Sequence, residues 1–167
     1  LNRATDLGVE KIICVGVDLE SSNKCIDLAH KFNNLYATVG YHPHESKLAE
    51  DHYLNTLESM SSDSKVVAIG EVGLDFHYNH SEKDTQEKIF LEQLELAKSI
   101  NLPAVIHSRN ADKETLEIMS KVTNSKGVIH CFASDLEQAN KIIDLGYYIS
   151  FTGLITFVPE LSDVIKN

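Results

Sequence analysis

Short apolar runs alternate along the chain with longer stretches in which apolar and polar residues mix. Within each run the apolar residues are continuous, which is typical of strands buried on both faces of a parallel sheet. The run that begins at Val66 is mostly β-branched, and β-branched residues favour strands. We therefore predict six strands, which lie within residues 10–17, 35–41, 66–72, 102–107, 127–132 and 147–153.

The stretches between the predicted strands have the periodicity of amphipathic helices. In residues 81–101 the apolar side chains recur at helical spacing, and Ser81 before acidic residues is a typical helix start. The expected buried face consists of Phe90, Leu94, Ala97 and Ile100. Residues 135–146 repeat the pattern, and Gly146 is a typical helix end. Their expected buried face consists of Leu136, Ala139, Ile142 and Ile143.

Repeated alternation of strand and helix predicts an α/β fold with a parallel sheet. Two architectures fit this pattern, the doubly wound sheet and the TIM-type (β/α)8 barrel. A nucleotide-binding doubly wound sheet carries a glycine-rich loop after its first strand, whereas residues 15–24 contain one glycine, Gly16. A barrel predicts polar, reactive residues at the ends of several strands, which this sequence has. We therefore predict a TIM-type barrel, of which the chain supplies about six of the eight strands.

Polar residues that can bind a metal follow three successive apolar runs. Glu71 comes directly after Gly70, and a carboxylate at the end of a buried strand is costly unless a cation accompanies it. One histidine at a strand end is usually a packed rim residue, but the strand ends of a barrel converge on one face. A carboxylate and two imidazoles suit a divalent metal such as zinc or manganese. The sequence therefore predicts a metal site formed by Glu71, His107 and His130.

Composition and charge narrow the class of protein. The 167 residues are 43% hydrophobic and 24% charged, as in ordinary globular proteins, and three scattered cysteines predict free thiols. The net charge of −10 argues against a broad nucleic-acid-binding face, although an enzyme can hold phosphates through metal ions. No stretch has the length of a membrane span and no signal peptide begins the chain. We expect a cytoplasmic protein without membrane contacts.

Several motifs together resemble those of the TatD family of metal-dependent deoxyribonucleases. They are "VGYHPH", "GEVGLDFHY", "QLELAKSINLPAVIHSR", "GVIHCF" and "YYISFTGLITF", and they occur in the family's order over nearly the whole chain. The resemblance implies a distorted TIM barrel of the amidohydrolase kind. It also implies hydrolysis of phosphodiester bonds with two divalent ions (magnesium, manganese or zinc), typically as a 3′→5′ exonuclease on DNA. DNA would then be held mainly through the ions.

The resemblance assigns roles to individual residues. Glu71 matches the ligand that bridges two metal ions in the family, and His107 and His130 match ligands of one ion. Beyond these ligands, we expect no further catalytic group in this chain. The same resemblance leaves the oligomeric state open.

Three further residues match positions that line the substrate cleft of the family: His42, His44 and Arg109. An arginine two residues after a ligand can hold a phosphate through two parallel hydrogen bonds. Alternatively, Arg109 forms only a structural salt bridge at the rim of the site. Asp75 follows Glu71 closely and has two readings that the sequence does not separate. It either orients a ligand from behind or caps the turn that follows.

The chain departs from the family pattern in two respects. After His130 the family continues Cys-Phe-Ser-Gly, whereas this chain has Ala133 and Ser134 after Phe132. The family's opening strand with His-x-His and its closing strand with an aspartate are not found. We therefore expect residues 1–167 to be a single hydrolase barrel domain without its first and last strands, inactive alone. A hydrolase of carbon–nitrogen or lactone bonds and a catalytically incomplete remnant remain alternatives.

Overall fold

The computed structural model describes residues 1–166, and its centre is one sheet of six parallel strands. Each strand pairs with the next one along the chain, so the order is β1-β2-β3-β4-β5-β6. All six predicted strands are confirmed, although several are shorter than the apolar runs. Their bounds are β1 Ile12–Val15, β2 Leu35–Val39, β3 Val66–Asp75, β4 Ala104–Arg109, β5 Gly127–Ile129 and β6 Tyr148–Ile149.

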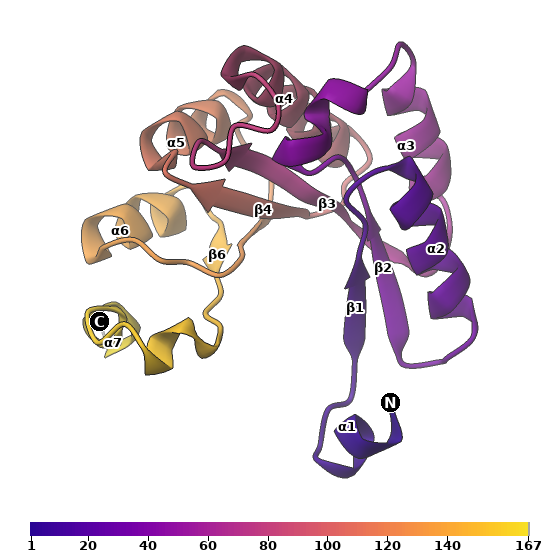
Figure 1. The fold of residues 1–167 in the computed structure, drawn as a ribbon, viewed down its shortest axis with the longest axis horizontal. Coiled ribbons are helices and arrows are strands. Elements are labelled where there is room, and N and C mark those ends of the chain that lie inside the picture. The colour runs from indigo at the N-terminus through magenta and orange to yellow at the C-terminus, as the bar shows by residue number, and fades with distance from the viewer. Residues whose placement is uncertain (167) are drawn as a thin grey trace.

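Most helices lie on the outer side of this sheet, which curves like an arch with β1 and β6 at its two ends (Figure 1). A doubly wound sheet would reverse its strand order and place helices on both faces. Sequential order with helices outside is the barrel arrangement, so the predicted TIM-type fold is confirmed. The helices are α1 Asn2–Asp6, α2 Leu19–His30, α3 Tyr53–Ser61, α4 Lys83–Ser99, α5 Asp112–Lys121, α6 Leu136–Asp144 and α7 Leu161–Lys166, with 3-10 turns at η1 Pro43–Leu48 and η2 Gly153–Thr156. Within residues 1–166, none of these helices is long and apolar enough to span a membrane.

Helix α4 confirms the predicted buried face and corrects its start. Phe90, Leu94 and Ala97 are almost fully buried in the core. Ile100, the fourth expected residue, follows the helix end and is only half-buried against the core. The helix begins at Lys83 rather than next to Ser81. Ser81 is itself buried, and its hydroxyl donates a hydrogen bond to the carbonyl of His44, 2.8 Å away. The serine therefore ties η1 to the loop before α4 instead of capping the helix.

Helix α6 has a narrower buried face than its sequence predicted. Ala139 and Ile142 are buried, but Leu136 and Ile143 are 36% and 53% exposed. The helix packs on β6, which has only two residues, so little sheet surface is available to cover its apolar stripe. Gly146 has φ of +86°, a left-handed conformation that suits a residue just after a helix end, as predicted.

Strands β3 and β4 approach each other closely at two glycines. A Cβ atom at Gly73 would lie 2.0 Å from the carbonyl oxygen of His107, and one at Gly70 would lie 2.7 Å from the Cβ of Val105. Only glycine leaves room for this approach. The pairing extends β3 to Asp75, beyond the end predicted at residue 72, and brings Asp75 beside Arg109.

Candidate metal centre

Glu71 lies at an irregularity in the pairing of β3 with β4. The register passes from Gly70 opposite Val105 to Val72 opposite Ile106, so Glu71 is the extra residue of a bulge. Its backbone N–H donates instead to the carbonyl of Gly16, just after β1, at 2.8 Å. Bulges commonly redirect a side chain next to an active site. Here the redirected carboxylate is only 15% exposed and meets histidines from other strand ends.

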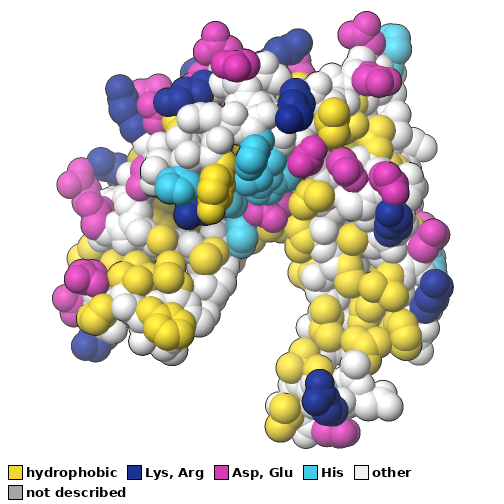
Figure 2. Space-filling model, in the orientation of Figure 1, with side chains coloured by type: hydrophobic (Ala, Val, Ile, Leu, Met, Phe, Trp, Pro, Cys, Tyr) yellow, Lys and Arg dark blue, Asp and Glu magenta, His cyan; other side chains and the backbone are white. Residues whose placement is uncertain are grey.

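Three imidazoles converge on one carboxylate oxygen, Oε1 of Glu71. Its distances are 2.6 Å to Nε2 of His130, 3.1 Å to Nδ1 of His107 and 3.6 Å to Nε2 of His42. The structure thus brings together the three residues predicted as metal ligands and adds His42. Figure 2 shows histidine side chains gathered at the top of the hollow between the two arms of the arch.

The closest mutual grouping differs from the predicted one. The three residues whose donor atoms all lie within 4.8 Å of one another are His42, Glu71 and His107, without His130. His130 is nevertheless nearer to Glu71 than His42 is. The hydrogen bond made by the second ring nitrogen of a histidine decides which nitrogen carries the proton, and so which one can bind a metal. Such bonds are present at His42 and His107.

The hydrogen bonds of His42 favour a donor role for this residue. Its Nδ1 accepts the backbone N–H of His44 at 3.1 Å, so the hydrogen of the neutral ring lies on Nε2, directed toward Glu71. A nitrogen that carries a hydrogen has no lone pair for a metal. His42 therefore offers a hydrogen bond to a group beside Glu71, while the lone pairs for a metal come from its neighbours.

Asp75 holds the opposite side of His107. The Oδ2 atom of Asp75 lies 3.2 Å from Nε2 of His107 and 2.9 Å from Nε2 of His44. A carboxylate there accepts the Nε2 hydrogen and leaves Nδ1 of His107 with a lone pair that faces Glu71 at 3.1 Å. Two acceptor atoms lie so close only when a proton or a metal ion is placed between them. The donor set therefore fits a divalent cation.

Asp75 fulfils both roles that the sequence left open. While Oδ2 orients the two histidines, Oδ1 accepts the backbone N–H groups of His77 and Tyr78 at 3.0 and 3.1 Å and so caps the turn. The residue is 1% exposed. Its position was predictable in part, because apolar Leu74 continues the strand pattern past Gly73 and makes Asp75 a strand end.

The charges at the site match this arrangement. Burial alone would raise the pKa of Glu71, but its interactions with the imidazoles of His107 and His130 more than offset this effect and hold the pKa of Glu71 well below its usual range. The hydrogen bond to Glu71 raises the pKa of His130. Burial lowers the pKa of His42 from 6.5 to about 4. At neutral pH an ionised carboxylate therefore stands beside a neutral His42.

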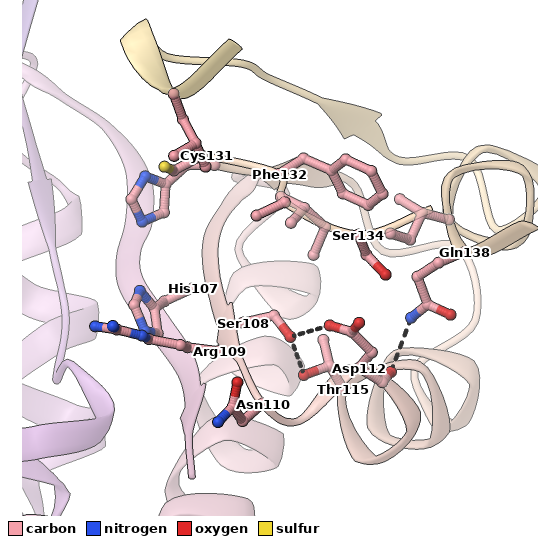
Figure 3. A pocket seen from close by; sticks show the side chains of 15 residues that line it. His107, Ser108, Arg109, Asn110, Asp112, Thr115, Cys131, Phe132, Ser134 and Gln138 are labelled. Atoms are coloured by element: carbon pink, nitrogen blue, oxygen red, sulfur yellow. Dashed lines mark hydrogen bonds between the residues drawn. The ribbon is translucent and has the colours of Figure 1, made fainter. Parts of the chain in front are cut away.

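Arg109 lies at the rim of the centre, at the end of β4. Its guanidinium carbon is 4.7 Å from the ring centroid of Tyr78, a cation–π arrangement. With His107 and His130 it lines a cavity of about 500 Å³, and Figure 3 shows its side chain beside that of His107. The polar residues deeper in this cavity, Ser108 and Asp112, were not predicted, because nothing in the local pattern separates them from ordinary helix-start residues.

A barrel-type sheet whose strand ends bring one carboxylate and several imidazoles together is typical of metal-dependent hydrolases. Comparison with known proteins agrees with this class. The family model described as TatD related DNase matches residues 1–167. The chain belongs to this family of metal-dependent hydrolases.

Individual relatives support the same assignment. The chain is 35% identical to the uncharacterized metal-dependent hydrolase YabD of Bacillus subtilis, over 100% of this chain and 67% of YabD. It is 34% identical to the 3′-5′ ssDNA/RNA exonuclease TatD of Cronobacter turicensis, over 92% of this chain and 59% of that protein. The crystal structure of the TatD homologue YjjV from Escherichia coli superposes with a TM-score of 0.90 at 34% identity, over 99% of this chain and 66% of YjjV. The chain thus spans about three fifths to two thirds of the length of these relatives.

Proposed function

We propose that this protein hydrolyses phosphodiester bonds of single-stranded DNA from the 3′ end, with divalent metal ions. The observation that carries the proposal is the convergence of His42, His107 and His130 on Oε1 of Glu71. Its membership of the TatD-related DNase family supports the reaction type, and relatives named as 3′-5′ exonucleases support the direction.

Within the proposal, Glu71, His107 and His130 are the metal ligands. Glu71 is ionised at neutral pH and central among the imidazoles, so its carboxylate would supply the negative charge that holds a divalent ion there. Asp75 keeps the hydrogen of His107 on Nε2 and its lone pair toward Glu71. Divalent ions bound there would supply a nucleophilic water and neutralise charge on the phosphate.

Of the three residues expected in the substrate cleft, His42 and Arg109 face the substrate in this proposal and His44 supports His42. His42 donates from Nε2 to an oxygen held beside Glu71, and His44 keeps His42 in that tautomer through its backbone N–H. Arg109 holds a phosphate oxygen from the rim, and the ring of Tyr78 restricts the orientation of its guanidinium. The negative net charge of −10 is consistent with a substrate held by these few groups rather than by a basic surface.

The test uses the full-length protein, stripped of metal and then supplied with magnesium, manganese or zinc. Single-stranded DNA labelled at its 5′ end should shorten stepwise, and DNA labelled at its 3′ end should release labelled mononucleotide first. Glu71→Gln should lower the rate more than about 100-fold, the upper end of what loss of a group behind a ligand costs. Glu95→Gln is the matched control, since Glu95 is exposed on α4 away from the site.

Three outcomes would contradict the proposal. Hydrolysis of cyclic amides or lactones without any hydrolysis of oligonucleotides would assign the protein to the alternative class. Undiminished activity of Glu71→Gln would remove Glu71 from the centre. Shortening from the 5′ end would reverse the proposed direction.

Arg109 gives a second test that separates binding from metal loading. Arg109→Ala should lower oligonucleotide kcat/KM by about 10-fold or more while the metal content stays unchanged. Arg109→Lys should restore little of that loss, because an ammonium lacks the fork of a guanidinium. Wild-type kinetics in both variants would show that Arg109 is only a rim residue.

A further inference from the structure

The cavity beside the metal centre has a deeper part that the proposed reaction does not use. It lies between the ends of β4 and β5 and the first turns of α5 and α6, and its volume of about 500 Å³ is in the range of small-molecule sites. His107 and His130 form its mouth, so a group that enters it is continuous with a group held at Glu71. The cavity therefore has the right place to receive part of a substrate.

Its two walls differ in chemistry. On one side Phe132, Ile142 and Leu154 present apolar surface, and the ring of Phe132 is nearly buried. On the other side Ser108, Asp112 and Thr115 present polar groups, and Figure 3 shows the hydroxyl of Ser108 hydrogen-bonded to both of the others. A flat, partly polar ligand would satisfy both walls.

The carboxylate of Asp112 has capacity left for a ligand. Its Oδ1 accepts the hydroxyl of Ser108 at 3.2 Å, whereas Oδ2 has no protein partner within residues 1–166. Asp112 is the first residue of α5, yet no N–H of that helix donates to its side chain. Capping therefore does not account for this carboxylate. The side chain of Gln138 reinforces the wall by donating to the backbone carbonyl of Asp112 at 2.9 Å.

We propose that this cavity holds the base of the nucleotide whose phosphate lies at the metal centre, and that Asp112 selects bases that carry an amino group. The proposal rests on the proposed function in that it takes the substrate to be a nucleic acid. A carboxylate accepts hydrogen bonds only, so it pairs with the amino group of cytosine, adenine or guanine. At position 4 of thymine and uracil it faces a carbonyl oxygen, which is repulsive, so these bases offer it only their N3–H. The same charge disfavours a phosphate in the deeper part of the cavity beside Asp112, so a phosphate would stay at the rim with Arg109.

Cytosine and thymine provide the sharpest comparison, since both are single rings and differ at position 4. Deoxycytidine and thymidine are titrated into the metal-free, full-length protein and binding is followed by NMR, with inorganic phosphate as a third ligand. Without metal and without phosphate on the nucleoside, the titration reports the cavity alone. Deoxycytidine should bind about 10-fold more tightly than thymidine, as expected for one specific contact to a base edge, and phosphate should not compete with it.

Asp112→Asn tests the residue itself. The substitution keeps the shape of the side chain and provides an amide that can donate to thymine, so the preference should fall to about 2-fold or reverse. Glu117→Gln is the charge-matched control, because Glu117 lies on the same helix but outside the cavity, and it should keep the preference. Thermal unfolding of each variant checks that it folds.

The outcomes separate this inference from the proposed function. Equal binding of the two nucleosides by the wild-type protein would overturn it, even if Asp112→Asn failed to fold. An unchanged preference in folded Asp112→Asn, or competition by phosphate, would also overturn it. Base selectivity without oligonucleotide hydrolysis would support the cavity assignment and contradict the nuclease proposal. Hydrolysis without base selectivity would do the reverse.

Discussion

The middle of the sheet and its last strands hold the site in different ways. Strands β3 and β4 share six paired positions, from Ile69 with Ala104 to Asp75 with Arg109, whereas β5 and β6 share two. Ile69 and Ile106 in the middle are fully buried, but Tyr148 on β6 is 77% exposed. The middle carries Glu71, Asp75 and His107, and the other region carries His130 and one wall of the cavity.

The two regions differ in which parts of the site they hold in place. The carboxylates that must keep a fixed distance to a histidine lie where the backbone is paired and packed most completely. The cavity wall around Phe132 and Ser134 belongs to loops and short elements, which tolerate variation more readily. We expect substitutions in the middle to cost more free energy of unfolding than matched substitutions near β5 and β6.

Gly73→Ala should have the largest effect. Its added Cβ would lie 2.0 Å from the carbonyl oxygen of His107, at a φ of +127° that alanine adopts only with strain. We expect a loss of at least about 3 kcal/mol in the free energy of unfolding, measured by urea titration of the metal-free protein. Gly153→Ala is the matched control, since a Cβ there meets no atom within 4 Å. Equal effects of the two substitutions would remove the claimed difference between the regions.

One buried and one half-buried glutamine provide the next comparison. The side chain of Gln86 is fully buried, accepts the N–H of Asp75 and donates to the carbonyls of Asp75 and Ser81. Gln86→Leu should cost about 2–4 kcal/mol, because it leaves buried backbone groups without partners. Gln138→Leu removes one bond to a half-buried residue and should cost about 1 kcal/mol. Chemical unfolding of both variants measures these costs. A larger loss of unfolding free energy in Gln138→Leu than in Gln86→Leu would argue against a more constrained middle of the sheet.

Acid should destabilise the metal-free protein through His42. Burial lowers the pKa of His42 from 6.5 to about 4, so between these values the unfolded chain binds a proton that the folded chain does not. The free energy of unfolding therefore falls as the pH drops through this window, by about 1–2 kcal/mol from pH 6.5 to 5. The raised pKa of His130 acts above pH 6.5 and the lowered pKa of Glu71 acts below 4.5, so neither masks the effect.

His42→Gln checks this assignment. The variant should show a flatter dependence of thermal stability on pH between 6.5 and 5 than the wild-type protein, with EDTA present in both. A pH dependence as steep as that of the wild type would place the responsible group elsewhere. His52→Gln serves as the control, because His52 is exposed at the start of α3.

The smallest effect is expected at an exposed residue near the last strands. Ile143→Val on α6 should change the free energy of unfolding by less than about 0.5 kcal/mol, since Ile143 is 53% exposed. Its neighbour Ile142 is 3% exposed, and Ile142→Val should cost about 1 kcal/mol. Calorimetric unfolding of the pair measures how much packing this region retains. A larger cost at Ile143 than at Ile142 would contradict the packing of α6 described above.

Local patterns in the sequence determined much of this protein. The six apolar runs became the six strands, and the spacing of Phe90, Leu94 and Ala97 marked the buried face of α4. Both are predictable because burial on a regular element imposes a short period on the sequence itself. That Glu71, His107 and His130 would lie together was predictable for a related reason, since the carboxyl ends of parallel strands share one face.

Other features depended on contacts between distant segments. Three contacts depend on how β3 pairs with both of its neighbours, β2 and β4, and on the bulge at Glu71. His42 faces Glu71, one carboxylate of Asp75 orients two histidines, and the guanidinium of Arg109 lies over Tyr78. The exposure of Ile143 follows from the shortness of β6. A residue's own neighbours in sequence carry no record of which strand will lie beside it or in which register. Only the assembled sheet decides those contacts, because their energy arises between parts of the chain that meet on folding.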